Sequence, residues 1–297
     1  MAQHAPMPGD VGIIDLMIGF PFTEDGKADA YARSVKGVKD AASADLKMPA
    51  GYMFDAPDTV DADEIDPIDI TFAAMDQYGI EQGLFGLSER SIEASKRHPG
   101  RVNFIIEVDP NDVMGAITTV RQARAEHGLA AVSVFPAGCL PQVPVDDPKM
   151  YALYATAVEL DIPVVVNAGI AGPRLPSACQ HVERFDPVCY DFPDLKLVMR
   201  HGAEPWEALA VKLMVKWPNL FYMTSAFAPK YYPRAVIEYA NTRGADKIMY
   251  AGYFPAGLTI ERLMTELPAV PLREHVWPKF LRENAMRVFG IEPLPAP

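Results

Sequence analysis

Short apolar segments recur along the chain, and segments with helical periodicity lie between them. The apolar segments predict eight strands, at residues 11–16, 82–87, 102–107, 130–135, 162–167, 195–200, 219–223 and 247–251. Helical periodicity predicts helices over 65–78, 112–127, 148–160, 205–217 and 233–243, several of which open on Pro or Asp. This alternation is typical of parallel βα units, and eight such units predict a closed (β/α)₈ TIM barrel.

One predicted connection is much longer than the usual few residues. Residues 20–64 separate the first strand from its helix, and loops that follow barrel strands open onto the catalytic face. We therefore expect this insertion to lie over a pocket as a lid. Its apolar part contains Tyr52, Met53 and Phe54, which either line a pocket for a substrate with an apolar or aromatic portion or pack on the barrel rim as a plug.

The end of the chain adds elements beyond the eight units. Residues 260–267 and 278–289 are predicted to form extra C-terminal helices that complete the outer ring, and 292–297 a Pro-rich tail. No linker or repeat divides the sequence. Residues 1–297 are therefore predicted to form a single domain.

Composition and charge narrow the classes of partner. The chain has 297 residues, 49% of them hydrophobic, and a formal net charge of -12, which argues against nucleic-acid binding. An anionic small-molecule substrate would therefore need a local basic pocket. Three cysteines without CxxC spacing, no apolar signal-peptide core and no run of about 18 apolar residues predict a soluble cytoplasmic protein that does not bind membranes.

Three passages carry a likeness to a known family. They are residues 12–21 (GIIDLMIGFP), residues 201–206 (HGAEPW) with 217–225 (WPNLFYMTS), and residues 245–255 (ADKIMYAGYFP) with 283–290 (ENAMRVFG). In this order and spacing the chain resembles the amidohydrolase-related (amidohydrolase 2, ACMSD-like) family. The resemblance implies a TIM barrel, an enzyme of small-molecule metabolism and a homodimer.

The sequence departs from that family where the family binds its metal ion. Met17 and Gly19 replace the two histidines after the first strand, Asn167 replaces the histidine of the fifth strand, and Tyr253 replaces the aspartate after the eighth. Asp15 is retained, but in the family it precedes the ligands. Because a thioether, a glycine, a carboxamide and a phenol do not make a zinc site, we predict neither a metal nor another cofactor.

His201 is the first candidate for catalysis without a metal. It ends the sixth strand at a position that, by the resemblance, assists binding or proton transfer. Arg200 and Glu204 bracket it and can hold a tautomer or shift its pKa. Strand alternation predicts that only one of Arg200 and His201 enters the barrel mouth, and we favour His201. The alternative is a histidine that is hydrogen-bonded under the rim.

Asn167 and Tyr253 are the other candidate catalytic residues. Their side chains are expected to converge on the volume that the metal occupies in the family, where a carboxamide and a phenol can stabilise an oxyanion. The alternative is that they only fill that volume by packing and by mutual hydrogen bonds.

Further residues are candidates for substrate binding. Arg174 and Lys230 can bind a carboxylate or phosphate, or remain solvated surface charges. Glu107 is a general base or a barrel-layer residue paired to an arginine. Met17 and Ser225 are expected to line the pocket. Because Ser225 has neither a His/Asp partner pattern nor a G-x-S-x-G turn, the sequence argues against a serine hydrolase.

Together these features predict a metal-independent hydrolase that acts on a small carboxylated cyclic or aromatic compound, by lactone or C–C bond hydrolysis. In this hypothesis His201 activates water, while Asn167 and Tyr253 donate hydrogen bonds. A lactonase-like branch of the family that works without metal makes metal loss compatible with catalysis. Two alternatives stay open: a non-oxidative decarboxylase or retro-Claisen lyase, and a non-catalytic ligand-binding barrel.

Overall fold

The computed structural model describes residues 4–23, 26–27, 31–32, 35–43, 46, 48–53, 55, 59–61 and 64–294. Phe54 and residues 295–297 of the predicted tail lie outside them. Eight parallel strands pair in chain order: β1 Ile13–Asp15, β2 Ile80–Gly86, β3 Val102–Glu107, β4 Ala131–Val134, β5 Val164–Asn167, β6 Leu197–Arg200, β7 Leu220–Met223 and β8 Ile248–Met249. All eight predicted strands are confirmed, with ends shifted by a few residues.

Contacts between the two ends of the sheet close the barrel. The Leu16 N–H donates to the Tyr250 carbonyl over 3.4 Å, and Ile18 forms a parallel bridge with Phe254. Loops that follow the strands therefore share one rim, as the predicted TIM barrel requires.

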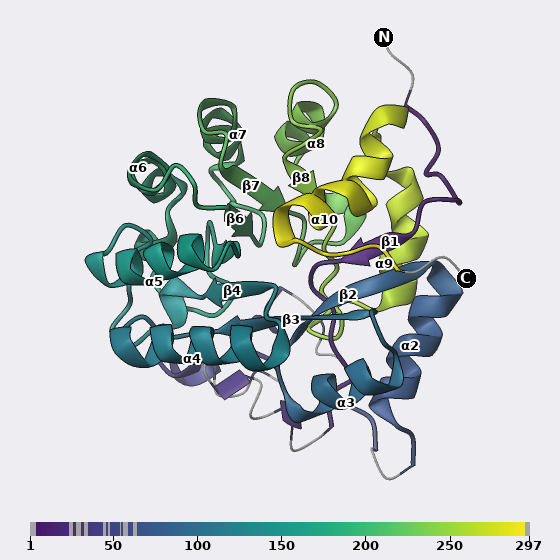
Figure 1. Cartoon of the computed structure of the whole chain (residues 1–297), viewed down its shortest axis with the longest axis horizontal. Helices are drawn as coiled ribbons and strands as arrows, with labels where there is room; N and C mark the ends of the chain where they lie inside the picture. Colours follow the sequence, from purple (N-terminus) through teal and green to yellow (C-terminus); the bar gives the residue numbers. More distant parts are fainter. Residues whose placement is uncertain are drawn as a thin grey trace.

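Helices surround the strands (Figure 1). Their bounds are α2 Pro67–Tyr78, α3 Glu89–Arg97, α4 Val113–His127, α5 Pro148–Glu159, α6 Phe185–Asp191, α7 Glu207–Lys216, α8 Arg234–Ala240, α9 Ile260–Glu266 and α10 Asn284–Phe289. Short 3-10 helices lie at Ala41–Ser43, Pro136–Gly138, Ala178–Gln180, Val182–Arg184, Pro229–Tyr231, Leu267–Ala269 and Glu274–Val276, and a π-helical turn at Lys279–Glu283 precedes α10. Neither α3 nor α6 was predicted. Only Ser91 and Ala94 of α3 are buried, and α6 is short.

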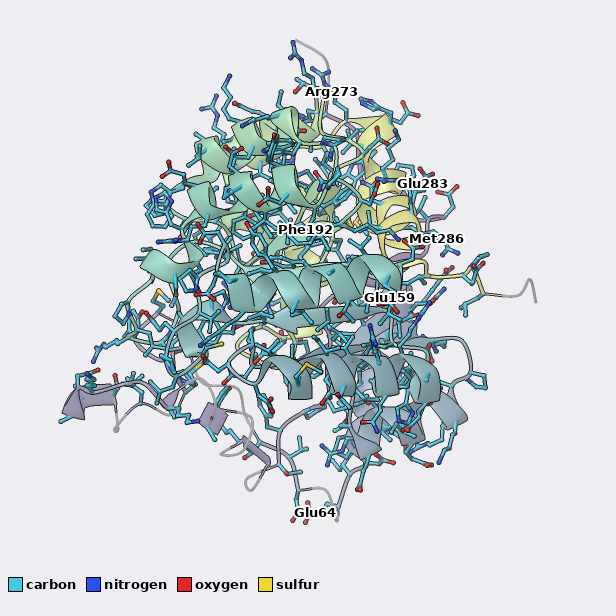
Figure 2. All side chains as sticks on the ribbon, turned by 60° about the vertical axis from the view of Figure 1, so that its left-hand side comes forward. Glu64, Glu159, Phe192, Arg273, Glu283 and Met286 are labelled. Carbon is cyan, nitrogen blue, oxygen red and sulfur yellow. The ribbon has the colours of Figure 1, made fainter. Side chains whose placement is uncertain are left out.

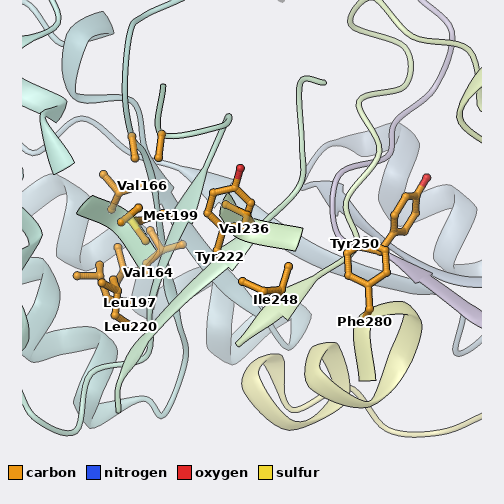
Figure 3. Packing of buried hydrophobic residues seen from close by; sticks show 14 of the residues in the cluster. Val164, Val166, Leu197, Met199, Leu220, Tyr222, Val236, Ile248, Tyr250 and Phe280 are labelled. Carbon is orange, nitrogen blue, oxygen red and sulfur yellow. The ribbon is translucent and has the colours of Figure 1, made fainter. Parts of the chain in front are cut away.

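Strand alternation divides the core into two layers. Val164 and Val166 of β5 pack with the helices in the outer cluster, which Figure 3 shows around β5 to β8. Val165, between them, belongs to the inner cluster with Val198 and Ile14. The barrel interior is thus filled by side chains, and a ligand can enter only at an end.

The last helix closes the amino-terminal end of the barrel. Val288 and Phe289 of α10 join the inner cluster, and Asn284 donates to the carbonyls of Ala245 and Ile248 over 2.7 and 2.9 Å. Figure 1 shows α10 across the strands near the centre of the view. For α10 the predicted place in the outer ring is therefore wrong, because its apolar side chains pack against the inward-facing residues of the strands.

Described residues of the insertion contact the opposite rim. Met48 is buried, the Val60 N–H donates to the Phe22 carbonyl over 2.8 Å, and the Tyr52 hydroxyl donates to the Gly172 carbonyl over 2.6 Å. In Figure 2, Glu64 at the end of the insertion and Arg273 lie at opposite edges of the molecule. Among the described residues, no helix is both long and apolar enough to span a membrane.

Candidate active site

A cavity of about 300 Å³ opens at the carboxyl ends of the strands, beneath the insertion. Barrel residues and insertion residues share its wall. The polar side chains on it are Tyr31, Glu107, Asn167, Gln180, Arg200, His201 and Tyr253, and the larger apolar ones are Met17, Phe22, Met48, Met53, Phe135, Ile170 and Phe227. The three residues predicted to carry catalysis therefore surround one cavity.

Arg200, the last residue of β6, crosses this cavity's floor. β5 and β6 pair with Asn167 beside Arg200, so the Arg200 Nε donates to Asn167 Oδ1 over 2.5 Å. Its Nη2 donates to Glu107 Oε2, at the end of β3, over 2.8 Å. Among the described residues Nη1 has no acceptor, so the guanidinium is fixed on two sides and keeps one edge for a ligand.

Both Arg200 and His201 line the cavity, and the prediction that only one of them does is wrong. The reason is the backbone of His201, whose φ of +67° lies in the left-handed region that non-glycine residues rarely adopt. The strand ends at Arg200, and strand alternation no longer applies to the next residue. Such strained backbone is retained where surrounding contacts enforce it, and it is common at functional sites.

Ser225 helps to hold His201 in this backbone conformation. It is fully buried behind His201, accepts the His201 backbone N–H over 3.2 Å, and lies 3.0 Å from the ring Nδ1 through its Oγ. It therefore has the histidine partner that the sequence pattern did not reveal, although it does not line the cavity. Its burial makes it a residue that orients His201 and not a nucleophile.

The same contact favours one of the two neutral tautomers of the His201 ring. Within the described part of the chain, Nδ1 is the one acceptor in reach of the Ser225 hydroxyl proton. Nδ1 then accepts, and the neutral ring carries its proton on Nε2, the nitrogen left for a ligand. His201 therefore offers a hydrogen-bond donor to the cavity.

Burial fixes the charge states of His201 and Tyr253. Burial first, and the charge of Arg200 second, hold the pKa of His201 well below its usual value, so the ring is neutral at physiological pH. Burial also raises the pKa of Tyr253, against the opposing effect of Arg200. The two rings meet edge to face with centroids 5.3 Å apart. Two neutral donors therefore stand beside one fixed cation.

Asp15 supports the site from behind. Its Oδ1 accepts the backbone N–H groups of Met17 and Gly252 over 2.9 and 2.7 Å, which ties the end of β1 to the loop that carries Tyr253. Oδ2 is buried without a hydrogen-bond partner among the described residues. Burial raises the pKa of Asp15 to about 7, although the two N–H groups oppose this shift.

Several predicted binding residues lie outside the cavity wall. Arg174 pairs with Asp40 over 2.8 Å, and its guanidinium lies over the ring of Tyr52 on the rim. Glu204 is exposed, and Lys230 lies 3.7 Å from Glu266 outside the mouth. Within the apolar segment of the insertion, Met53 lines the cavity while Tyr52 packs on the rim, so both readings of that segment apply in part.

Tyr31 is a cavity residue that the sequence did not reveal. Its hydroxyl is buried without a hydrogen-bond partner among the described residues. Burial first, and Tyr253 second, raise the pKa of Tyr31 to about 12, so it is a neutral donor. No sequence signal marks this residue, because it is a single tyrosine in a charged part of the insertion.

A divalent cation does not fit these residues. Asn167 Oδ1, the one oxygen that could replace a family ligand on β5, already accepts from the Arg200 guanidinium, whose charge would repel a metal ion. Met17 and Tyr253 supply a thioether and a neutral phenol. The described residues contain no cluster of three or more His, Cys, Asp or Glu side chains suited to a metal.

The eight parallel strands with helices between them define a TIM barrel. Its cavity lies at the carboxyl ends of the strands, where TIM-barrel enzymes have their active sites. The amidohydrolase family model matches residues 27–291, and the chain belongs to this family. A comparison with curated protein sequences found no match.

Solved structures with this fold include functionally diverse proteins. An uncharacterised TIM-barrel protein from Bordetella bronchiseptica is 22% identical with a TM-score of 0.72, covering 94% of this chain and 99% of that one. The 5-carboxyvanillate decarboxylase of Novosphingobium aromaticivorans, complexed with manganese, is 15% identical with a TM-score of 0.65, covering 98% and 99%. A probable 2-pyrone-4,6-dicarboxylic acid hydrolase from Acinetobacter baumannii is 14% identical with a TM-score of 0.65, covering 94% and 99%. At these identities the likeness concerns the fold.

Proposed function

We propose that this protein is a metal-independent enzyme that hydrolyses a small carboxylated cyclic or aromatic compound, with a lactone as the first candidate. The observation that carries the proposal is the Arg200 guanidinium, held by Asn167 and Glu107 at the floor of a cavity that also contains the neutral donors His201 and Tyr253. The fixed cation binds the carboxylate of the substrate, and the aligned donors stabilise developing negative charge in place of a metal ion.

In the proposed hydrolysis, Glu107 acts as the base, while His201 and Tyr253 donate hydrogen bonds to the reacting carbonyl oxygen. Water adds to the lactone carbonyl, and its proton passes to Glu107 Oε1, which has no partner among the described residues. The negative charge that forms on the carbonyl oxygen is stabilised by His201 Nε2–H and by the Tyr253 hydroxyl. The ring C–O bond then breaks, and the leaving oxygen takes up the proton held by Glu107, which returns to its carboxylate form. Glu107 is thus the base here, in place of His201, because Ser225 leaves His201 as a donor.

Hydrolysis is tested with 2-oxopyran-5-carboxylate, a lactone with one carboxylate, by following the loss of its ultraviolet absorbance. We expect turnover by protein treated with EDTA, and a loss of at least about 100-fold in Arg200→Gln and His201→Asn. Lys230→Gln and His127→Gln are matched controls outside the cavity and should retain wild-type rates. Binding without turnover across a panel of carboxylated lactones would instead identify a non-catalytic ligand-binding barrel.

Non-oxidative decarboxylation is the second candidate, because the tautomer held by Ser225 makes His201 a donor suited to an enolate-like intermediate. Several proteins of this fold are decarboxylases by name, including the 2,6-dihydroxybenzoate decarboxylase from Rhizobium. Assays of carbon dioxide release from hydroxybenzoates, run beside the lactone assay, separate the two reactions. Release of carbon dioxide without ring opening would select the lyase.

A further inference from the structure

The charged side chains of the cavity limit the number of negative charges that its ligand can carry. Among the described residues that line it, Arg200 and Glu107 are the charged side chains, and they are paired over 2.8 Å. His201 is neutral. The mouth therefore carries no net charge from these residues, and one free guanidinium edge is available to an anion.

Around this pair, the residues that the structure describes offer no second cation for another carboxylate. Lys36 lines a neighbouring cavity that shares Glu107 with the mouth, but that cavity also contains the carboxylates of Asp109 and Asp112. Arg174 is held by Asp40 on the rim. A second carboxylate on a ligand would lose its hydration beside Glu107 without gaining a cationic partner from the described residues, which is costly.

The insertion side of the cavity offers a different kind of contact. Tyr31 and Tyr253 both line it as neutral phenols, and the Tyr31 hydroxyl is buried without a partner. A buried donor without an acceptor is unfavourable, and an uncharged ligand oxygen would satisfy it. Phe22, Met48 and Met53 form an apolar part of the wall that suits a ring.

We propose that the mouth selects a ring compound with a single carboxylate, which binds Arg200, and an uncharged oxygen, which accepts from Tyr31, and that Glu107 excludes dicarboxylates. The inference rests on the proposed function, since it takes the same cavity as the substrate site. It names Glu107 and Tyr31 as residues that determine specificity.

The test is calorimetric titration with two isosteric pairs: 4-carbamoylbenzoate against benzene-1,4-dicarboxylate, and 3-carbamoylbenzoate against benzene-1,3-dicarboxylate. The members of a pair differ by one charge at nearly constant shape. We expect the amide of at least one pair to bind at least about tenfold more tightly than its dicarboxylate. Glu107→Gln should reduce that ratio to about threefold or less, because it removes the repelling charge. Glu204→Gln, which changes an exposed carboxylate outside the cavity, should leave the ratio unchanged.

Tyr31→Phe tests the second contact without changing charge. It should weaken binding of the preferred carbamoylbenzoate about fivefold or more while leaving benzoate affinity within about twofold, since benzoate lacks the acceptor. Tyr190→Phe, at an exposed tyrosine, is the control. Equal or tighter binding of the dicarboxylate in both pairs would overturn the inference and leave the proposed function standing. Failure of every carboxylate to bind, with folding verified by circular dichroism, would overturn both.

Discussion

His201 combines a left-handed backbone, a buried serine partner and a depressed pKa. Its position at the cavity could be predicted from the family-like passage that begins with it. Its tautomer could not, because Ser225 lies 24 residues further along the chain and meets it only when β6 and β7 pair. Tyr31 was missed for a related reason, since only the folded insertion brings it to the cavity.

The tautomer of His201 can be measured by nitrogen NMR on ring-labelled protein. We expect a neutral ring with its proton on Nε2 at pH values where a free imidazole becomes protonated, because burial and Arg200 lower the pKa of His201. In Ser225→Ala the two tautomers should become mixed. Ser133→Ala changes a buried serine of β4 and serves as the control. A ring that titrates near its usual pKa in the wild type would contradict this account.

Asp15 makes stability depend on pH in a defined direction. Its pKa is raised to about 7 in the folded protein, so between about pH 4 and 7 the folded state keeps a proton that the unfolded chain loses. The free energy of unfolding therefore falls as pH rises through this window, by up to about 1.4 kcal/mol per pH unit from this group.

Chemical denaturation of Asp15→Asn at about pH 5 and pH 8 checks this dependence. The variant should gain stability relative to the wild type as pH rises, because the asparagine cannot ionise. Asp186→Asn is the control, since Lys216 and then Trp217 hold the pKa of Asp186 below its usual value despite burial, and both states are ionised across this range. An Asp15→Asn difference that is equal at both pH values would contradict the buried-carboxyl argument.

At the level of elements, periodicity predicted every strand but missed α3 and α6. In α3 the buried positions are Ser91 and Ala94, so it has no apolar stripe to detect. In α6 a length of 7 residues leaves less than two full turns of pattern. The insertion was recognised by its length, whereas its contacts with the loop after β5 depend on the folded barrel.

Those contacts hold the insertion over the mouth. Arg174 pairs with Asp40, and the Tyr52 hydroxyl donates to the Gly172 carbonyl. We expect Arg174→Gln combined with Tyr52→Phe to accelerate hydrogen exchange and limited proteolysis within residues 20–64, with little change in the global unfolding midpoint. Arg121→Gln, which removes an exposed pair with Glu159, should not affect the insertion. Unchanged exchange in the double variant would show that other contacts hold the segment.

On the scale of the whole molecule, the order of eight βα units fixed the barrel and the end that carries the site. The predicted place of α10 in the outer ring was wrong, because the sequence does not tell whether its apolar side chains pack in that ring or across the end of the barrel. Phe289→Ala should cost about 3–5 kcal/mol in one cooperative unfolding transition, because the side chain fills the inner cluster. Met114→Ala, at an exposed position, should cost little. If Phe289→Ala instead removed only a separate, minor unfolding transition, the result would contradict a single core.

The central claim is that Arg200 and its neighbouring donors replace the metal chemistry expected of this family. The most direct measurement is the rate of 2-oxopyran-5-carboxylate hydrolysis by purified protein whose metal content has been determined, before and after EDTA and with manganese or zinc added back. The account predicts substoichiometric metal, a rate unchanged by EDTA or added metal, and loss of that rate in Arg200→Gln. Activity that disappears with EDTA and returns with one equivalent of metal would contradict it.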